Sequence, residues 1–131
     1  MAIEKSRKLI LVVDDDDFFA TLVKGRLAKF NCEINVASNG NLAMAYLKDK
    51  KPDIIFLDII LPGESGFEIL KKIKADKQLK DIPVVIISNL SQVSDVELGK
   101  ELGAVDYITK HGSNYNDLLD KILREYLELQ I

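Results

Sequence analysis

Residues 54–66 read Ile-Ile-Phe-Leu-Asp-Ile-Ile-Leu-Pro-Gly-Glu-Ser-Gly. The continuous apolar run at residues 54–57 is typical of a strand that is buried on both faces of a parallel sheet. Asp58 follows this run at once, and Pro62 and Gly66 then mark a loop. In open α/β sheets the loops that follow the strands carry the binding and catalytic groups. Asp58 is therefore the first candidate for a functional residue.

Other strand-like runs also end in polar side chains: residues 9–13 before Asp14 and Asp15, residues 84–87 before Ser88, and the more alternating residues 105–109 before Lys110. The carboxyl ends of parallel strands meet at one edge of a sheet, so these side chains should lie close to Asp58. The sequence therefore predicts a pocket that combines several carboxylates, a hydroxyl and an ammonium group.

Segments of helical period separate the strands and predict an α/β fold of five βα units, with a further strand at residues 34–37. The expected helices cover residues 18–30, 41–50, 65–75, a short segment that a capping box at Ser94 opens and Gly103 closes, and residues 115–129. The alternation alone leaves the strand order open. We predict a doubly wound, five-stranded parallel sheet of the flavodoxin-like (βα)5 type, because its order 2-1-3-4-5 brings Asp14 and Asp15 beside Asp58.

The last helix, residues 115–129, carries more apolar residues than one stripe needs. The expected core stripe contains Tyr115, Leu118, Leu119, Ile122 and Tyr126. Leu123 and Leu127 are expected on its flank, either half-buried or part of a surface for a dimer or a target.

Composition limits the class of protein. The 131 residues, 47% of them hydrophobic, suit one domain, and we expect residues 1–8 to be an extension and residues 9–131 the domain. The net charge of -3 disfavours direct nucleic-acid binding. The single cysteine, Cys32, excludes an intramolecular disulfide, and the apolar stretch at residues 9–13 is too short for a signal peptide or a membrane span. We therefore expect a cytoplasmic location.

The acidic residues need a cation. Two carboxylates ~4 Å apart repel by about 4 kcal/mol at an effective dielectric constant of 20, so three ionised aspartates must bind a metal ion or protons. With only His111 and Cys32 as soft ligands, oxygen ligands and Mg²⁺ are the simplest solution. Lys110 and Ser88 could bind oxygens of a phosphoryl group, and Asp58 could be the nucleophile that forms an acyl phosphate.

This ordered set of residues resembles the receiver domain of two-component response regulators, from residue 9 to about residue 127. The resemblance implies that Asp58 is the phosphoacceptor and that Mg²⁺ is the cofactor. The implied metal ligands are Asp14, Asp15, Asp58 and the backbone carbonyl of Ile60. The implied phosphate-binding or switch groups are Ser88, Asn89, Lys110 and Tyr107. It further implies that phosphorylation moves Ser88 toward the phosphate and Tyr107 inward, and changes the surface formed by the fourth helix, fifth strand and fifth helix.

The implied partners are a histidine kinase or histidine phosphotransfer protein as phosphodonor and a downstream protein target, with no direct contact to nucleic acid or membrane and with homodimer formation on phosphorylation as a further expectation. The implied protein is a switch and not a turnover enzyme, either as a stand-alone regulator or as part of a larger protein. Three departures from the family pattern are visible. His111 stands where proline usually follows the lysine, so the aim of Lys110 is an open question. Asn89 could narrow access to the site, and the apolar Ile60 and Leu90 predict slow self-dephosphorylation.

Other functions compete with the phosphorylated switch. The first is a receiver that acts as a protein-interaction module without phosphorylation. A phosphatase of the haloacid dehalogenase type would need a second aspartate two residues after the nucleophile, where Ile60 stands. A flavodoxin-like FMN carrier is disfavoured because the acidic first loop would repel a phosphate in the absence of a metal ion.

Overall fold

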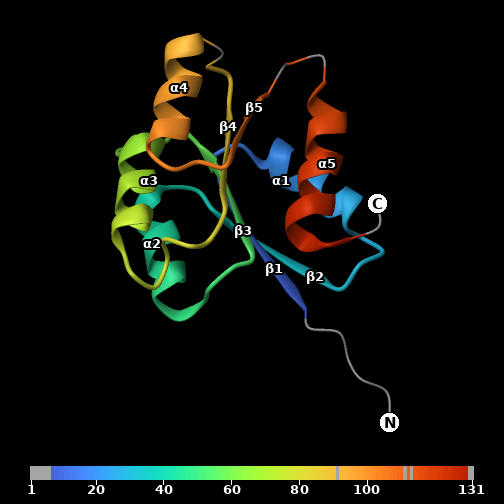
Figure 1. Cartoon of the computed structure of the whole chain (residues 1–131). Helices are drawn as coiled ribbons and strands as arrows, with labels where there is room; N and C mark the ends of the chain where they lie inside the picture. Colours follow the sequence, from blue (N-terminus) through green and yellow to red (C-terminus); the bar gives the residue numbers. More distant parts are fainter. Residues whose placement is uncertain (1–6, 91, 111, 113, 130–131) are drawn as a thin grey trace.

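Strands and helices alternate along the whole described chain (Figure 1). The computed structural model describes residues 7–90, 92–110, 112 and 114–129. The strands are β1 (Lys8–Val13), β2 (Cys32–Ala37), β3 (Ile54–Asp58), β4 (Val84–Ser88) and β5 (Asp106–Thr109). The helices are α1 (Asp17–Arg26), α2 (Gly40–Asp49), α3 (Gly66–Ala75), α4 (Val93–Glu101) and α5 (Tyr115–Leu127). The predicted extension at residues 1–8 lies mostly outside the described residues, and His111 lies outside them as well.

The five strands form one parallel sheet in the order β2-β1-β3-β4-β5, which confirms the predicted fold class and strand order. β1 and β3 are neighbours, and Val13 pairs with Leu57 at their carboxyl ends. Asp14 follows Val13 and Asp58 follows Leu57, so two aspartates lie next to each other at the ends of these strands. β4 and β5 pair from Val85 with Asp106 to Ser88 with Thr109, so Lys110 follows directly on the end of the ladder.

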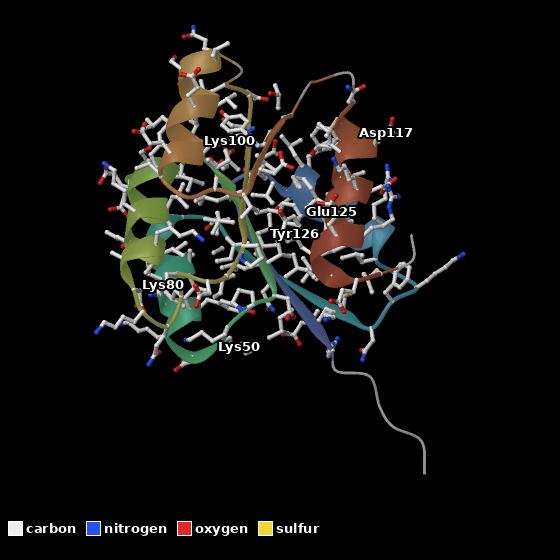
Figure 2. All side chains as sticks on the ribbon, in the orientation of Figure 1. Lys50, Lys80, Lys100, Asp117, Glu125 and Tyr126 are labelled. Atoms are coloured by element: carbon white, nitrogen blue, oxygen red, sulfur yellow. The ribbon has the colours of Figure 1, made fainter. Side chains whose placement is uncertain are left out.

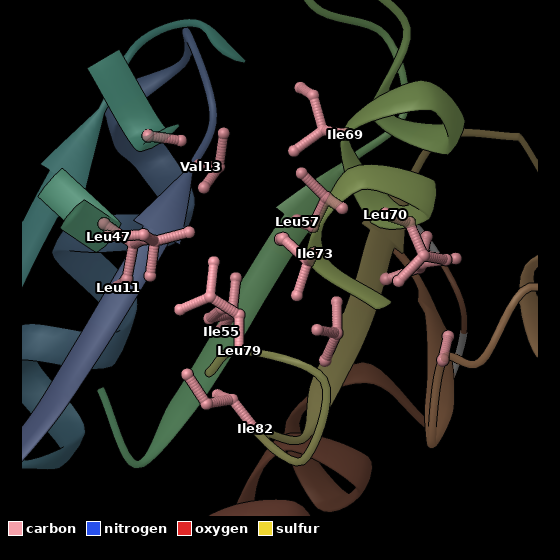
Figure 3. Packing of buried hydrophobic residues seen from close by; sticks show 14 of the residues in the cluster. Leu11, Val13, Leu47, Ile55, Leu57, Ile69, Leu70, Ile73, Leu79 and Ile82 are labelled. Atoms are coloured by element: carbon pink, nitrogen blue, oxygen red, sulfur yellow. The ribbon is translucent and has the colours of Figure 1, made fainter. Parts of the chain in front are cut away.

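Alternate strand residues point to opposite faces of the sheet and form two core clusters, because successive side chains of a strand alternate in direction. Leu11 and Val13 belong to the cluster covered by α2 and α3, part of which is drawn in Figure 3. Ile10 and Val12 belong to the cluster covered by α1 and α5. In Figure 1, α2, α3 and α4 lie on one side of the sheet, and α1 and α5 lie on the other.

The predicted burial of the last helix was wrong at two positions. Leu123 and Leu127 were expected on the flank, but both are fully buried in the cluster that α5 covers. Tyr115 and Tyr126 are only partly buried. Compared with the expectation, α5 is rotated about its axis so that Leu119 and Leu123 lie in the middle of its buried face. This buried face is wider than the spacing of the two tyrosines suggested. Neither Leu123 nor Leu127 is available for a dimer or target surface.

Two helix ends also differ from the sequence expectation. Helix α4 starts at Val93, after Gln92, so Ser94 lies in its first turn and is not its N-cap, and the capping-box prediction was wrong. Gly103, with φ of 111°, follows the end of α4 as expected. Helix α1 ends at Arg26, although Phe30 continues its apolar spacing. Phe30 packs against the core from the following turn, which the periodicity could not distinguish from a further helical turn.

Gly66, at the start of α3, packs directly against the backbone of the Asp58 loop. Its N–H donates to the carbonyl of Ile59 at 2.9 Å. A Cβ at this position would lie 2.1 Å from the Asp58 carbonyl oxygen and 2.7 Å from the Ile59 Cα. Both neighbours are backbone atoms, so they cannot move without shifting the candidate nucleophile.

We predict that Gly66→Ala lowers the free energy of unfolding by about 1–3 kcal/mol or more, because overpacking against backbone forces a local shift. Chemical denaturation of the purified variant measures this change. Gly25→Ala is the matched control, since a Cβ there meets nothing within 4 Å. Equal stability of Gly66→Ala and wild type would contradict the tight packing of α3 on this loop.

Candidate functional site

The buried polar side chains gather at the carboxyl edge of the sheet. Many charged side chains elsewhere are exposed, among them Lys50, Lys80 and Glu125, which Figure 2 labels. Among the described residues, the buried polar or charged residues are Asp14, Asp58 and Ser88, with exposed fractions of 1%, 5% and 0%. Two buried carboxylates on neighbouring strands are costly unless they are paired or bind a cation, so this edge is the candidate site.

Lys110 lies between the two buried carboxylates. Its Nζ is 2.8 Å from Asp14 Oδ2 and 2.8 Å from Asp58 Oδ2. The side chains of Lys110, Asp14 and Asp58 are 13%, 0% and 7% exposed, so these ion pairs are largely shielded from water. These ion pairs therefore join three of the four charged residues that the strand ends predicted, and they show the Lys110 ammonium aimed into the acidic pocket.

The backbone orients both carboxylates. Asp14 Oδ1 accepts a hydrogen bond from the N–H of Asp16 at 3.0 Å, and Asp58 Oδ1 accepts one from the N–H of Ile60 at 3.2 Å. In each case a carboxylate bonds to the backbone two residues ahead, which is the local turn that aspartate favours. One oxygen of each carboxylate is held by its own loop, and the other is directed to Lys110. Asp16 also caps helix α1 by accepting from the N–H of Phe18.

Burial and charge shift the pKa values of this site. Burial raises the pKa of Asp14, and the charge of Asp58 adds to that rise, against the lowering effects of Lys110 and the Asp16 N–H. Burial alone would lower the pKa of Lys110, but its contacts with Asp14 and Asp58 outweigh burial and raise it. At neutral pH the lysine is therefore a cation, and both buried carboxyl groups share its charge.

The acidic residues fit a divalent metal ion. Asp14, Asp15 and Asp58 each place a carboxylate oxygen within 4.8 Å of the others, and Asp15 is exposed. Asp14 Oδ2 is buried and has the Lys110 ion pair, but within the described residues no donor forms a hydrogen bond of good geometry with it. Oxygen ligands of this kind suit a hard cation such as Mg²⁺ or Mn²⁺. The backbone N–H of Ile60 contacts Asp58, and its carbonyl as a metal ligand stays a prediction.

The predicted switch residues lie around the same edge. Ser88 is fully buried, and its hydroxyl accepts a hydrogen bond from the N–H of Leu90 at 3.2 Å. Tyr107 is 8% exposed, and its hydroxyl donates to the carbonyl of Leu90 at 2.7 Å. Asn89 is exposed. Both Ser88 and Tyr107 thus contact the backbone of the loop between β4 and α4.

The sequence did not indicate the role of Leu90 as the backbone partner of both side chains. Main-chain contacts depend on how a loop turns and leave no signature in residue type.

Tyr115 was expected only as a core residue. Its ring packs edge-on against Phe19 with centroids 6.1 Å apart, and the charge of Lys110 acts on its hydroxyl. Its position five residues after Lys110 was the available signal.

Together, the fold and the site define an open α/β protein with an acidic pocket at the carboxyl edge of its sheet. In this pocket a lysine pairs with two aspartates, and the carboxylates are close enough to bind a metal ion. The sequence matches the family described as the response regulator receiver domain over residues 10–123. The chain belongs to this family, and the resemblance seen in the sequence is confirmed.

Curated relatives and solved structures agree with this assignment. The chain is 35% identical over 101 residues to Protein PilH of Pseudomonas aeruginosa, covering 77% of this chain and 84% of PilH. It is 38% identical over 103 residues to the phosphate regulon transcriptional regulatory protein PhoB of the same organism, covering 79% of this chain but only 45% of PhoB. The chain therefore spans less than half the length of this relative, whose full activity does not transfer to it.

Two solved structures are similar over nearly their whole length. The Mn²⁺-bound form of the response regulator Rcp1 is 32% identical with a TM-score of 0.81, covering 95% of this chain and 97% of that chain. The phosphorylated cyanobacterial phytochrome response regulator RcpA is 32% identical with a TM-score of 0.84, covering 96% and 98%. Divalent metal binding and phosphorylation therefore both occur in proteins with this fold.

Of the helices in the described ranges, none has the length and apolar character to cross a membrane.

Metal binding should depend on pH in a defined direction. Because the folded-state pKa of Asp14 is raised, its carboxyl binds a proton more tightly in the folded than in the unfolded protein, so the metal-free protein gains stability as pH falls toward that pKa. A metal ion competes with this proton. We predict that Mg²⁺ at about 100 times its dissociation constant adds about 2.7 kcal/mol to the free energy of unfolding at neutral pH, and less in mild acid.

Chemical denaturation with and without Mg²⁺ at the two pH values measures this difference. The control is Asp14→Asn, in which the stabilisation by Mg²⁺ should be smaller and change less with pH. Equal stabilisation of the wild-type protein at both pH values would contradict the prediction.

Proposed function

We propose that the chain is a signalling switch that accepts a phosphoryl group on Asp58 from a phosphohistidine of a histidine kinase or histidine phosphotransfer protein. The observation that carries the proposal is the position of Lys110, whose ammonium lies 2.8 Å from both Asp14 and Asp58. A structural ion pair needs one carboxylate and one ammonium, whereas here a single ammonium is shared by two buried carboxyl groups. Groups with such environments concentrate at functional sites.

In the proposed reaction an oxygen of Asp58 forms a bond to phosphorus while the bond from phosphorus to the donor histidine nitrogen breaks, and the electron pair of that bond returns to the imidazole. Mg²⁺, held by Asp14, Asp15, Asp58 and the carbonyl of Ile60, would neutralise charge on the phosphoryl oxygens. Lys110 would exchange its contact with Asp58 for a phosphoryl oxygen. Ser88 would donate its hydroxyl to another oxygen, and Asn89 would flank the entrance.

The output surface in this proposal is formed by α4, β5 and α5. Ser88 and Tyr107 share Leu90 as a backbone partner, so a move of Ser88 toward the phosphoryl group would disturb the hydrogen bond of Tyr107. Tyr107 also packs under α4, since a Cβ at Gly99 would lie 3.4 Å from its ring. A change at Tyr107 would therefore reach α4 and alter what binds there. We propose a protein target for this surface, and a phosphorylation-dependent homodimer would use it too.

An apolar hollow along α1, the helix that follows the Asp14 loop, supports a protein as phosphodonor. Phe18, at the start of α1, is 71% exposed. Together with Thr21, Leu22, Gly25 and Arg26 it lines a hollow of about 470 Å³. An exposed large apolar side chain two residues after Asp16 offers contact area for a docked protein, which a small phosphodonor would not need.

The direct test is a Mg²⁺-dependent phosphoryl adduct that forms on the wild-type protein and disappears when Asp58 is replaced by asparagine.

Cytoplasmic location, which the sequence suggested, stays a prediction.

The phosphorylated form should be long-lived. Hydrolysis of an acyl phosphate requires a positioned water molecule. The two positions that the family resemblance links to this step carry the apolar side chains of Ile60 and Leu90. Ile60 is 57% exposed but has no polar side-chain atom to orient water. We predict a lifetime of minutes or longer in Mg²⁺ after the donor is removed, measured by the decay of the adduct in intact-mass spectra.

Ile60→Asn supplies a hydrogen-bonding group at the same place and should shorten the lifetime, whereas Ile60→Val should not. A wild-type lifetime of seconds would refute this prediction without touching the assignment of Asp58.

A further inference from the structure

The loop between β5 and α5 must aim Lys110 across the end of the sheet. The backbone N–H of Lys110 donates to the carbonyl of Ser88 at 2.8 Å, which extends the β4–β5 ladder one residue beyond Thr109. This bond fixes where the Lys110 backbone starts. It leaves open the direction in which the chain then turns, and that direction decides where the ammonium points.

Gly112 closes the turn that follows. Its N–H donates to the carbonyl of Thr109 at 3.0 Å, so this hydrogen bond ties Gly112 back to the residue that precedes Lys110. The carbonyl of Gly112 in turn accepts from the N–H of Tyr115 at 3.3 Å. Gly112 is therefore bonded on both sides, toward the end of β5 and toward the start of α5.

Tyr115 fixes the far end of this loop in the core. Its ring packs edge-on against Phe19 at 6.1 Å between centroids, and Phe19 packs edge-on against Phe56 of β3 at 5.1 Å. The loop is thus held at the β4–β5 ladder on one end and at an aromatic cluster on the other. The Thr109–Gly112 bond lies between these anchors.

The space around Gly112 leaves little room for a side chain. A Cβ would lie 3.3 Å from the Thr109 carbonyl oxygen and 3.8 Å from the Thr109 Cβ. The closer atom is the acceptor of the bond that closes the turn. An added methyl group would therefore push Gly112 and Thr109 apart at the point where the turn is held together.

We propose that Gly112 is a positioning residue for Lys110: the glycine-closed turn aims the ammonium between Asp14 and Asp58. This inference rests on the proposed function of the site. Both contacts of Lys110 are 2.8 Å long, so a small rotation of the turn breaks them. A misplacement of about 1 Å in a preorganised site can cost about 100-fold in rate or affinity.

Two ligands that respond oppositely to Lys110 test the inference. Beryllofluoride with saturating Mg²⁺ imitates the phosphoryl group and needs the ammonium, and its affinity can be followed by fluorine NMR. Mg²⁺ alone competes with the ammonium for the carboxylates. In Gly112→Ala and Gly112→Pro, we expect the beryllofluoride affinity to fall by about 10- to 100-fold and the Mg²⁺ affinity to rise. General damage to the site would weaken both ligands.

The same measurements in a Lys110→Met background complete a double-mutant cycle. Gly112→Ala should then change the Mg²⁺ affinity little, because the group that it positions is absent. The control is Gly25→Ala. Gly25 lines the hollow proposed for the protein donor and is none of the residues assigned to Mg²⁺ or the phosphoryl group, and a Cβ there meets open space, so this variant should keep both affinities at the wild-type level.

The outcomes separate this inference from the proposed function. If the wild-type protein binds no beryllofluoride, the proposed function fails. If the wild-type protein binds it and the Gly112 variants bind equally well, only the inference is overturned. A full effect of Gly112→Ala on Mg²⁺ affinity in the Lys110→Met background would also overturn it, and denaturation curves identify any variant that fails to fold.

Discussion

Asp58→Asn should abolish the phosphoryl adduct that the wild-type protein forms with a phosphodonor and Mg²⁺. The amide has the shape of the carboxylate but lacks the charge and nucleophilicity that acyl phosphate formation requires. The fold should survive, because the amide oxygen in the variant can still accept the N–H of Ile60 and Lys110 keeps its ion pair with Asp14. Removal of one charge also relieves repulsion in the pocket, since the charge of Asp58 contributes to the raised pKa of Asp14.

Intact-mass spectrometry of both proteins with and without Mg²⁺ measures the adduct. Asp17→Asn is the matched control, because it removes the same charge from an exposed position in the first turn of α1. Since Asn89 could hinder small donors, a negative result should be repeated with phosphohistidine-bearing kinases. A persistent adduct in Asp58→Asn would move the acceptor to another side chain. No wild-type adduct and no beryllofluoride response would favour an interaction module whose binding is unchanged in Asp58→Asn.

Most of the fold could be predicted because the buried strands carry a strong signal. β3 and β4 are apolar on both faces, so their sequences are continuous hydrophobic runs, and each ends at a polar residue. The helix ends were predicted less well. The apolar spacing of α1 runs on to Phe30 because a residue in a turn can fill the same core as one in a helix. The rotation of α5 depends on how it packs on the sheet, and its many leucines allowed more than one stripe.

The residues of the site followed from topology. Once β1 and β3 are neighbours, Asp14 and Asp58 must lie side by side, and the pairing of Ser88 with Thr109 brings Lys110 to the same edge. Asp14 is buried, whereas the adjacent Asp15 is exposed. This difference depends on how the loop after β1 turns, which the residue types do not specify. The shared ammonium and the two bonds to Leu90 are tertiary contacts, and no residue pattern could have specified them.

Lys110→Met should destabilise the metal-free protein at neutral pH by about 3–5 kcal/mol, toward the lower end because Asp58 retains slight exposure. Methionine keeps most of the length and apolar stem of lysine, so the loss is mainly of charge. Two buried carboxylates would then face each other without a cation. In the wild type the raised pKa of Lys110 means that this stabilisation is complete at neutral pH and is lost only as pH rises through that pKa.

The deficit of Lys110→Met should shrink under two conditions, and this pattern identifies its electrostatic origin. Without the ammonium the pKa of Asp14 rises further, so acidification protonates the pocket and restores stability. Mg²⁺ should restore it at neutral pH by supplying the missing positive charge. Denaturation curves of wild type, Lys110→Met and the exposed control Lys100→Met across pH and Mg²⁺ concentration measure both effects. A deficit that stayed constant under every condition would instead reflect lost packing, and the cation-balanced pocket would have to be abandoned.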